Sequence, residues 1–152
     1  MNKKTICLNM IVRNESQVIR RCLVSIKQLI DYWVIVDTGS NDGTQAIILD
    51  FLSDIPGELH ERSWVSFAFN RNEALALAKN KGDYLLFIDA DDWLEMPSSF
   101  VWPELNKDRY FVAWRIMGEI DRHTLLINHD YLGNGKAQST REWFVRKIFQ
   151  AE

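Results

Sequence analysis

Residues 84–88 constrain the fold more than any other segment, because Tyr84-Leu85-Leu86-Phe87-Ile88 is continuously apolar. A strand without polar alternation is typical of the centre of a sheet that is buried on both faces. Such burial requires other elements above and below the sheet, and the crossover helices between parallel strands supply them. The segment therefore predicts an α/β fold in which helices flank a mostly parallel sheet.

The sequence before this segment alternates between strand-like and helix-like patterns. Residues 5–12 and 33–36 are apolar and rich in β-branched side chains, whereas apolar residues recur at helical spacing over 18–30. Residues 67–79 contain the strong helix-forming run Ala74-Leu75-Ala76-Leu77-Ala78. This alternation predicts parallel strands joined by right-handed crossovers. We expect strands at 5–12, 33–36, 58–62 and 84–88, and helices at 18–30, from near Asp42 onward and at 67–79.

The pattern changes after Pro97 and Pro103. Short β-rich segments follow, separated by residues that favour turns, which is typical of antiparallel strands. A length of 152 residues suits a single hydrophobic core. We therefore expect one domain that ends in antiparallel strands around 110–117, 124–128 and 143–149, with a turn at Gly133-Asn134-Gly135.

The composition is that of a globular protein, with 47% hydrophobic and 26% charged residues. A formal net charge of -3 argues against a nucleic-acid-binding protein that works by charge alone, because such proteins carry a basic face. The two cysteines, Cys7 and Cys22, lie in apolar surroundings on a predicted strand and a predicted helix. We interpret both as reduced core residues.

The chain begins with basic residues and a short apolar run that contains Asn9, which is typical of a first strand rather than of a secretory signal. No stretch approaches the roughly 20 apolar residues that a membrane-spanning helix requires. These features predict a cytoplasmic protein without a transmembrane segment. They leave open a peripheral position at a membrane.

Three polar motifs follow predicted strands at the point where each strand ends. Arg13-Asn14-Glu15 follows the first strand, Asp37 and a Gly-Ser loop follow the second, and Asp89-Ala90-Asp91 follows the buried strand. In open α/β sheets, ligands bind outside the carboxyl ends of the strands. We therefore expect these motifs to form one site.

Asp89 and Asp91 are the candidate metal ligands. Residues two apart on an extended segment point to the same side, so these carboxylates can converge while the small Ala90 turns away. Their mutual repulsion favours a hard divalent cation, and Mg²⁺ or Mn²⁺ commonly joins one or two carboxylates to phosphate oxygens. An isolated motif of this kind more often caps a turn together with residues such as Asp92. Its position after an apolar strand favours the metal site.

Asp37 and Arg71 each allow two interpretations. The Asp37 carboxylate can accept hydrogen bonds from a base or a ribose, or it can simply stabilise its turn, whereas Asp42 suits a helix N-cap. Arg71 can be an ordinary solvated charge, or it can offset a diphosphate and hold the carboxylates in place. Residue type alone leaves both alternatives for Arg71 open.

Four segments in this order resemble family-2 glycosyltransferases of the GT-A fold: residues 9–15 (NMIVRNE), 36–44 (VDTGSNDGT), 69–74 (FNRNEA) and 87–92 (FIDADD). The resemblance implies an inverting transferase that uses a nucleotide-diphosphate sugar, most often a UDP-sugar, and a divalent metal, Mn²⁺ or Mg²⁺. It also implies that 1–96 is the nucleotide-sugar-binding portion of the domain and 97–152 the incomplete start of an acceptor-side portion.

The resemblance assigns roles to individual residues. Asn14 and Glu15 would lie beside the nucleotide, Asp37 would contact the base or ribose, and Arg71 would support the pocket. Asp89 would face the ribose, and Asp91 the metal and the diphosphate. The nucleotide-sugar-binding residues that we expect are Val12, Asn14, Glu15, Asp37, Arg71, Asp89, Ala90 and Asp91, with Asp89 and Asp91 as metal ligands.

The catalytic base and the acceptor are not assigned from the sequence. Inversion needs a base that removes the proton of the acceptor hydroxyl. An alternative is therefore a nucleotide-sugar-binding module or a truncated fragment, either one without independent transferase activity. A phosphotransferase is disfavoured, because the sequence has no phosphate-binding Gly-rich loop with a Lys. The late titratable residues, none within a convincing motif, are Asp121, His123, His129, Asp130 and Glu142.

Among the six tryptophans, only Trp93 is expected near the ligand, because it follows the acidic motif closely. The other five are interpreted as packing residues: Trp33, Trp64, Trp102, Trp114 and Trp143.

Overall fold

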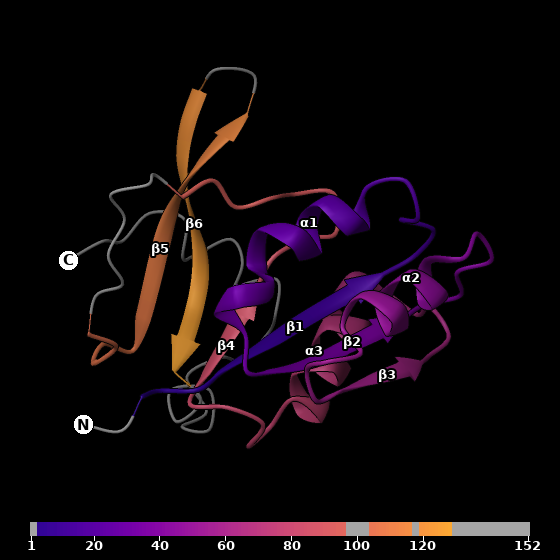
Figure 1. Cartoon of the computed structure of the whole chain (residues 1–152), viewed down its shortest axis with the longest axis horizontal. Helices are drawn as coiled ribbons and strands as arrows, with labels where there is room; N and C mark the ends of the chain where they lie inside the picture. The colour runs from indigo at the N-terminus through magenta and orange to yellow at the C-terminus, as the bar shows by residue number, and fades with distance from the viewer. Residues whose placement is uncertain (1–2, 97–103, 117–118, 129–152) are drawn as a thin grey trace.

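The computed structural model describes residues 3–96, 104–116 and 119–128, in which six strands form one sheet in the order β3-β2-β1-β4-β6-β5 (Figure 1). The strands are β1 (Ile6–Val12), β2 (Tyr32–Asp37), β3 (Gly57–Glu61), β4 (Tyr84–Phe87), β5 (Arg109–Ile116) and β6 (Glu119–Asn128). The helices are α1 (Ile19–Ile26), the 3₁₀ turn η1 (Lys27–Leu29), α2 (Thr44–Phe51) and α3 (Phe67–Leu77).

The sheet is parallel in its N-terminal part and antiparallel in its C-terminal part. β1 pairs in parallel with β2 and β4, and β2 pairs in parallel with β3. β6 pairs antiparallel with both β4 and β5. The expected mostly parallel sheet with helices on its faces is therefore confirmed, as is the change of strand direction after β4.

β6 is longer than the apolar pattern predicted. It begins at Glu119, which pairs with Ile116 of β5, and includes the polar residues Asp121 and Arg122. Backbone pairing with β5 extends the strand through residues whose side chains give no strand signal. The predicted strand at 143–149 and the turn at Gly133-Asn134-Gly135 lie outside the described residues.

Each face of the sheet packs against its own helices. Leu8 and Met10 of β1 belong to the hydrophobic cluster that contains the buried residues of α1 and α2. Cys7 belongs to a second cluster with Ala78, which follows α3, and the Asn9 amide donates to the carbonyl of Ala74 in that helix. The side-chain alternation of a strand thus assigns α1 and α2 to one face and α3 to the other (Figure 1).

The central strands are buried on both faces, as the continuous apolar run predicted. All four residues of β4 are buried, and Leu85 and Leu86 have no exposed surface. Both cysteines are free and buried, which confirms their interpretation as reduced core residues. Trp33 is also a core residue, and its ring lies so close to Gly57 that a Cβ there would be 2.2 Å from it.

The start of α2 is stabilised by hydrogen bonds from the loop that precedes the helix. α2 begins at Thr44, preceded by Gly43 at a φ of 91°, while the Asp42 carboxylate accepts hydrogen bonds from the Thr44 amide and hydroxyl. Asp42 therefore stabilises this helix start from one residue before the cap position. α1 is shorter than the predicted 18–30 helix, because the chain tightens into η1 after Ile26.

A polar network joins the edge strand β3 to its neighbours. Glu58 accepts hydrogen bonds from the Tyr32 hydroxyl at 2.8 Å and from the Lys81 ammonium, and its second oxygen lies 2.9 Å from His60 Nε2. The Lys81 hydrogen bond, followed by those of Tyr32 and His60, lowers the pKa of Glu58 to about 2. Ionised Glu58 therefore stabilises the folded state.

Replacing Glu58 with glutamine should reduce the amount by which the free energy of unfolding falls between neutral and acidic pH. A carboxyl with a lowered folded pKa contributes stability that is present above its unfolded pKa of about 4.3 and is lost as the pH falls toward 2. Urea unfolding at pH 7 and pH 3 measures this loss. Glu61→Gln, at an exposed position on the same strand, is the control. An equal pH dependence in Glu58→Gln and the wild type would contradict the role assigned to Glu58.

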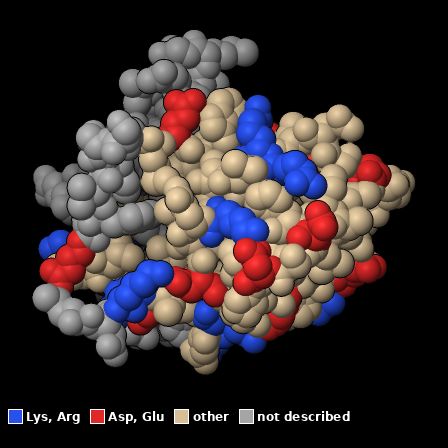
Figure 2. Space-filling view, in the orientation of Figure 1, with Lys and Arg blue, Asp and Glu red and all other residues tan. Residues whose placement is uncertain are grey.

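The described surface carries charges of both signs. On the face shown in Figure 2, acidic and basic side chains are interspersed rather than separated into large areas of one sign. Within the described residues, no helix has the length and apolar content needed to cross a membrane.

Candidate functional site

The loops that follow β1 and β2 are bound to each other. Asn14 has a φ of 54°, its amide donates to the Ser40 hydroxyl, and its side-chain oxygen accepts from the Asn41 amide. Glu15 donates its backbone N–H to the Thr44 hydroxyl at 2.8 Å. These bonds use Asn14 and Glu15 to fix the two loops side by side at the carboxyl edge of the sheet.

Val12 and Asp37 end the two strands from which these loops depart. The Val12 carbonyl accepts from both the amide and the hydroxyl of Thr38. One oxygen of Asp37, Oδ1, accepts from the amides of Gly39 and Ser40 at 2.8 and 2.7 Å. The other oxygen, Oδ2, is buried and has no hydrogen-bond partner among the described residues. Asp37 therefore stabilises its turn and still has one unused acceptor.

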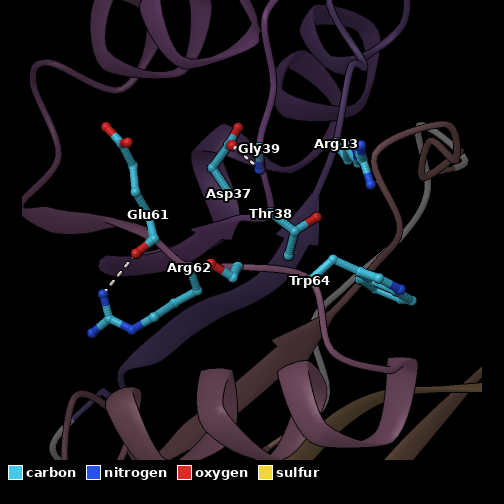
Figure 3. A pocket seen from close by; sticks show the side chains of 8 residues that line it. Arg13, Asp37, Thr38, Gly39, Glu61, Arg62 and Trp64 are labelled. Atoms are coloured by element: carbon cyan, nitrogen blue, oxygen red, sulfur yellow. Dashed lines mark hydrogen bonds between the residues drawn. The ribbon is translucent and has the colours of Figure 1, made fainter.

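A hollow of about 470 Å³ opens beside Asp37, at the ends of β1, β2 and β3 (Figure 3). Figure 3 shows Thr38 in the middle of this hollow, with Arg13 and Trp64 on one side and Glu61 and Arg62 on the other. The lining residues are Arg13, Asp37, Thr38, Gly39, Glu61, Arg62, Ser63 and Trp64.

Trp64 was interpreted as a packing residue, and that interpretation is wrong. Its side chain is 48% exposed and lines the hollow. The amphipathic patterns of strands and helices do not reach Trp64, because it lies between β3 and α3. Its position shortly after the end of a strand was the signal that could have identified it.

Asp89 is held by a buried arginine, Arg71, which lies on α3 on the sheet face opposite α1 and α2. Arg71 has no exposed surface, and its guanidinium donates to Asp89 Oδ1 at 3.3 Å and to the Asn9 carbonyl at 3.4 Å. Burial lowers the pKa of Arg71, and the charge of Asp89 opposes this shift. The burial excludes the interpretation of Arg71 as a solvated charge. Arg71 instead holds Asp89, whose side chain remains 48% exposed.

The acidic motif lies on a turn rather than on the extended segment that we expected. The Asp92 amide donates to the Asp89 carbonyl at 3.1 Å, and the chain turns at Ala90 and Asp91. The methyl group of Ala90 is buried in the hydrophobic cluster beneath α1 and α2. Ala90 therefore turns inward, as expected, while Asp91 is exposed.

Acidic side chains from three loops gather at this edge. Burial raises the pKa of Glu15, and the charges of Asp91, Asp42 and Asp89 raise it further. The order β2-β1-β4 explains this proximity, because the loop after β1 lies between the loops after β2 and β4. These carboxylates repel one another, and a bound cation would relieve that repulsion.

The donor set fits a divalent metal that shares its coordination with a ligand. Among the described residues, no three acidic, histidine or cysteine side chains are placed to hold a metal by themselves. Mg²⁺ typically uses one or two carboxylates and takes its other oxygens from water and phosphates. Asp89 and Asp91 can supply those carboxylates, and the hollow lies at the same carboxyl edge of the sheet.

The structure describes the strand position of two of the residues considered for the catalytic base. Asp121 and His123 lie on β6, on the far side of β4 from the hollow. His129, Asp130 and Glu142 lie outside the described residues, as do Trp102 and Trp143.

Comparison with known proteins identifies the family. Residues 7–131 match glycosyl transferase family 2. A TPR repeat-containing protein of Synechococcus elongatus is 37% identical over 65% of this chain and 25% of its own length. An uncharacterized glycosyltransferase of Rickettsia felis is 29% identical over 70% of this chain and 36% of its own length.

Solved structures show the same fold. The crystal structure of TarS residues 1–349 from S. aureus superposes with a TM-score of 0.50 and 25% identity, over 59% of this chain and 28% of the solved 1–349 chain. The match thus spans between a quarter and just over a third of each of these three chains. The match to residues 7–131 covers most of the 152 residues. The chain therefore belongs to glycosyl transferase family 2 and has the α/β fold of the GT-A glycosyltransferases.

Proposed function

We propose that the chain binds a nucleotide-diphosphate sugar and a divalent metal, as the donor-binding part of an inverting glycosyltransferase. The observation that carries the proposal is the arrangement at one sheet edge. A hollow lined by Asp37, whose buried Oδ2 has no hydrogen-bond partner among the described residues, lies at the ends of β1, β2 and β3, and the carboxylates of Asp89 and Asp91 follow the adjacent β4. In this proposal the nucleoside occupies the hollow, and a diphosphate bound to a metal lies on the acidic side.

The state of Asp37 favours uracil as the base. Oδ1 already accepts two backbone hydrogen bonds, so Oδ2, which is buried in this structure, is the oxygen that a base would have to reach. An ionised carboxylate only accepts, and therefore selects a base with an N–H donor. Uracil presents one ring N–H between two carbonyls, whereas guanine presents two adjacent donors that need two acceptors. We therefore propose a UDP-sugar as the donor.

The residues on the acidic side have distinct proposed tasks. Asp91 is exposed and binds the metal, and Asp89 joins it while remaining fixed by Arg71. Glu15, Asn14 and the end of β1 at Val12 border the nucleotide between the hollow and the metal. The buried Ala90 contributes its backbone, because its side chain lies in the core.

Sugar transfer joins the acceptor oxygen to the anomeric carbon as the bond from that carbon to the diphosphate oxygen breaks. The acceptor proton goes to a base, and the nucleoside diphosphate leaves with the bonding electrons. A divalent metal would stabilise the negative charge that develops on the diphosphate. Holding that metal against the phosphates is the contribution of Asp89 and Asp91.

We propose that residues 1–96 perform donor binding and that 97–152 begin the acceptor side. Donor binding without transfer is the alternative, since no residue has been assigned as the base. Release of UDP from UDP-sugars in the presence of hydroxyl acceptors distinguishes the two. Acceptor-stimulated release supports a transferase, and tight donor binding with no release supports a binding module.

Calorimetry with UDP and GDP, each with and without Mn²⁺, tests the proposal. We expect UDP to bind more tightly than GDP, and Mn²⁺ to strengthen UDP binding. Asp37→Asn retains the Oδ1 acceptor but replaces Oδ2 with a donor, so it should weaken UDP binding about tenfold to a hundredfold.

Asp50→Asn, at an exposed position on α2, is the matched control and should bind UDP as the wild type does. Nucleotide binding that is absent, or that is indifferent to Mn²⁺, would overturn the proposed function. Equal affinities for UDP and GDP would overturn the assignment of uracil alone.

A further inference from the structure

Three side chains of helix α1 make hydrogen bonds to the backbone of the segment that contains the acidic motif. After β4 the chain passes along α1 (Figure 1). Arg21 Nη2 donates to the Asp91 carbonyl at 2.7 Å, and Cys22 Sγ donates to the Asp89 carbonyl at 3.5 Å. The Ser25 hydroxyl accepts from the Leu94 amide at 3.0 Å. These contacts fix the main chain and involve neither the Asp89 carboxylate nor the Asp91 carboxylate.

Arg21 makes a second contact with the same segment. Its guanidinium lies over the ring of Trp93 at 4.0 Å from the ring centre, within the range of a cation–π interaction. The indole N–H of Trp93 in turn donates to Glu95 at 3.1 Å. The planar guanidinium thus holds a backbone oxygen of the motif and a side chain two residues later at the same time.

The other end of α1 is attached to the loop that carries Glu15. The Glu15 carbonyl accepts from the amides of Val18 and Ile19, at 3.0 and 2.9 Å, where the helix begins. α1 therefore connects the loop after β1 to the loop after β4. Both of these loops border the proposed metal and diphosphate position.

We propose that Arg21 is a positioning residue for the metal site: by holding the Asp91 carbonyl and the Trp93 ring, it keeps the Asp91 carboxylate oriented toward the metal. This inference rests on the proposed function. Groups that orient metal ligands from outside the coordination sphere typically change metal affinity about 10- to 100-fold when they are removed. Arg21 acts through the main chain, because it donates to the backbone carbonyl of the residue that bears the ligand and not to the ligand oxygens.

The neighbouring Arg20 provides a matched control. It lies on the same helix with the same charge, but it faces α2, with Asp50 at 3.8 Å and the Phe51 ring at 5.4 Å. Replacing Arg20 removes a cation–π contact with Phe51 and an ion pair with Asp50, whereas replacing Arg21 removes a cation–π contact with Trp93 and a hydrogen bond to a carbonyl. It leaves the acidic motif untouched.

The test compares UDP affinity with and without Mn²⁺ in Arg21→Ala, Arg21→Lys and Arg20→Ala. We expect Arg21→Ala to lower the UDP affinity measured with Mn²⁺ about 10- to 100-fold and to leave the affinity without metal unchanged. Lysine retains the charge and an ammonium donor group but loses the planar fork, so Arg21→Lys should show a smaller loss than Arg21→Ala. Arg20→Ala should match the wild type in both conditions.

A merely structural role for Arg21 would lower both affinities together, or would lower the melting temperature without changing the effect of Mn²⁺. Either result would overturn the inference, as would wild-type behaviour of Arg21→Ala. If the wild type itself showed no effect of Mn²⁺, the proposed function would fail together with this inference. A normal Mn²⁺ effect in Arg21→Ala would refute the positioning role alone.

Discussion

Asp91→Asn should abolish the effect of Mn²⁺ on UDP binding while leaving metal-free binding intact. Asparagine keeps the size of the side chain but lacks the negative charge that a hard divalent cation requires. Removing a group that only orients a metal ligand lowers metal affinity about 10- to 100-fold. Removing the ligand itself should therefore lower metal affinity at least about 100-fold. Calorimetric titration of UDP at saturating and zero Mn²⁺ measures the change.

Asp92→Asn is the matched control for this prediction, because it removes the same charge one residue later. It should retain the Mn²⁺ effect. Retention of the effect in Asp91→Asn would refute the assignment of Asp91 as a metal ligand. If Asp89→Asn lost the effect while Asp91→Asn kept it, the ligand would be Asp89.

Truncating Arg71 should produce the largest loss of stability among the site residues. Arg71→Ala empties a position with no exposed surface, between the rings of Phe67 and Phe87 at 5.7 and 5.8 Å from the guanidinium carbon. Truncation of a large buried side chain to alanine typically costs about 2 to 5 kcal/mol. Asp89 is half exposed, so water can solvate the carboxylate that loses its partner. Urea unfolding measures the free-energy change.

Arg71→Met separates packing from charge at the same position. Methionine fills much of the space with an unbranched stem, so the stability loss should stay below about 1.5 kcal/mol. Mn²⁺-dependent UDP binding should nevertheless weaken about 10- to 100-fold, because Asp89 is no longer held. Lys79→Met, at an exposed position just after α3, is the control. Unchanged UDP binding in Arg71→Met would show that Arg71 supports only the fold.

Much of the sheet follows from local patterns. The apolar run at 84–88 required burial on both faces, and the observed β4 lies between β1 and β6 with α1 and α3 on opposite sides. The polar residues Asn14, Asp37 and Asp89 lie at or just after the ends of strands, and parallel strands bring their carboxyl ends to one edge. The composition of the site edge was therefore predictable, because strand direction and side-chain period are local properties of the chain.

Contacts between segments distant in the chain could not be predicted from such local patterns. Arg71 carries the same charge as any surface arginine, and only the packing of α3 against β1 buries it beside Asp89. The turn at Ala90 and Asp91 depends on α1, whose Arg21 and Cys22 bind carbonyls of that segment. Neither contact leaves a periodic signal in the sequence.

The sequence by itself determined which residues end the strands, and therefore which side chains can meet at the carboxyl edge. Only the tertiary structure decided how each of them is used. It left Asp37 with one free oxygen, fixed Asp89 through a buried charge, exposed Asp91 and Trp64, and turned Ala90 into the core. The physical reason is that burial and hydrogen-bond partners are set by elements far apart in the chain, whereas periodicity reports only on neighbours along it.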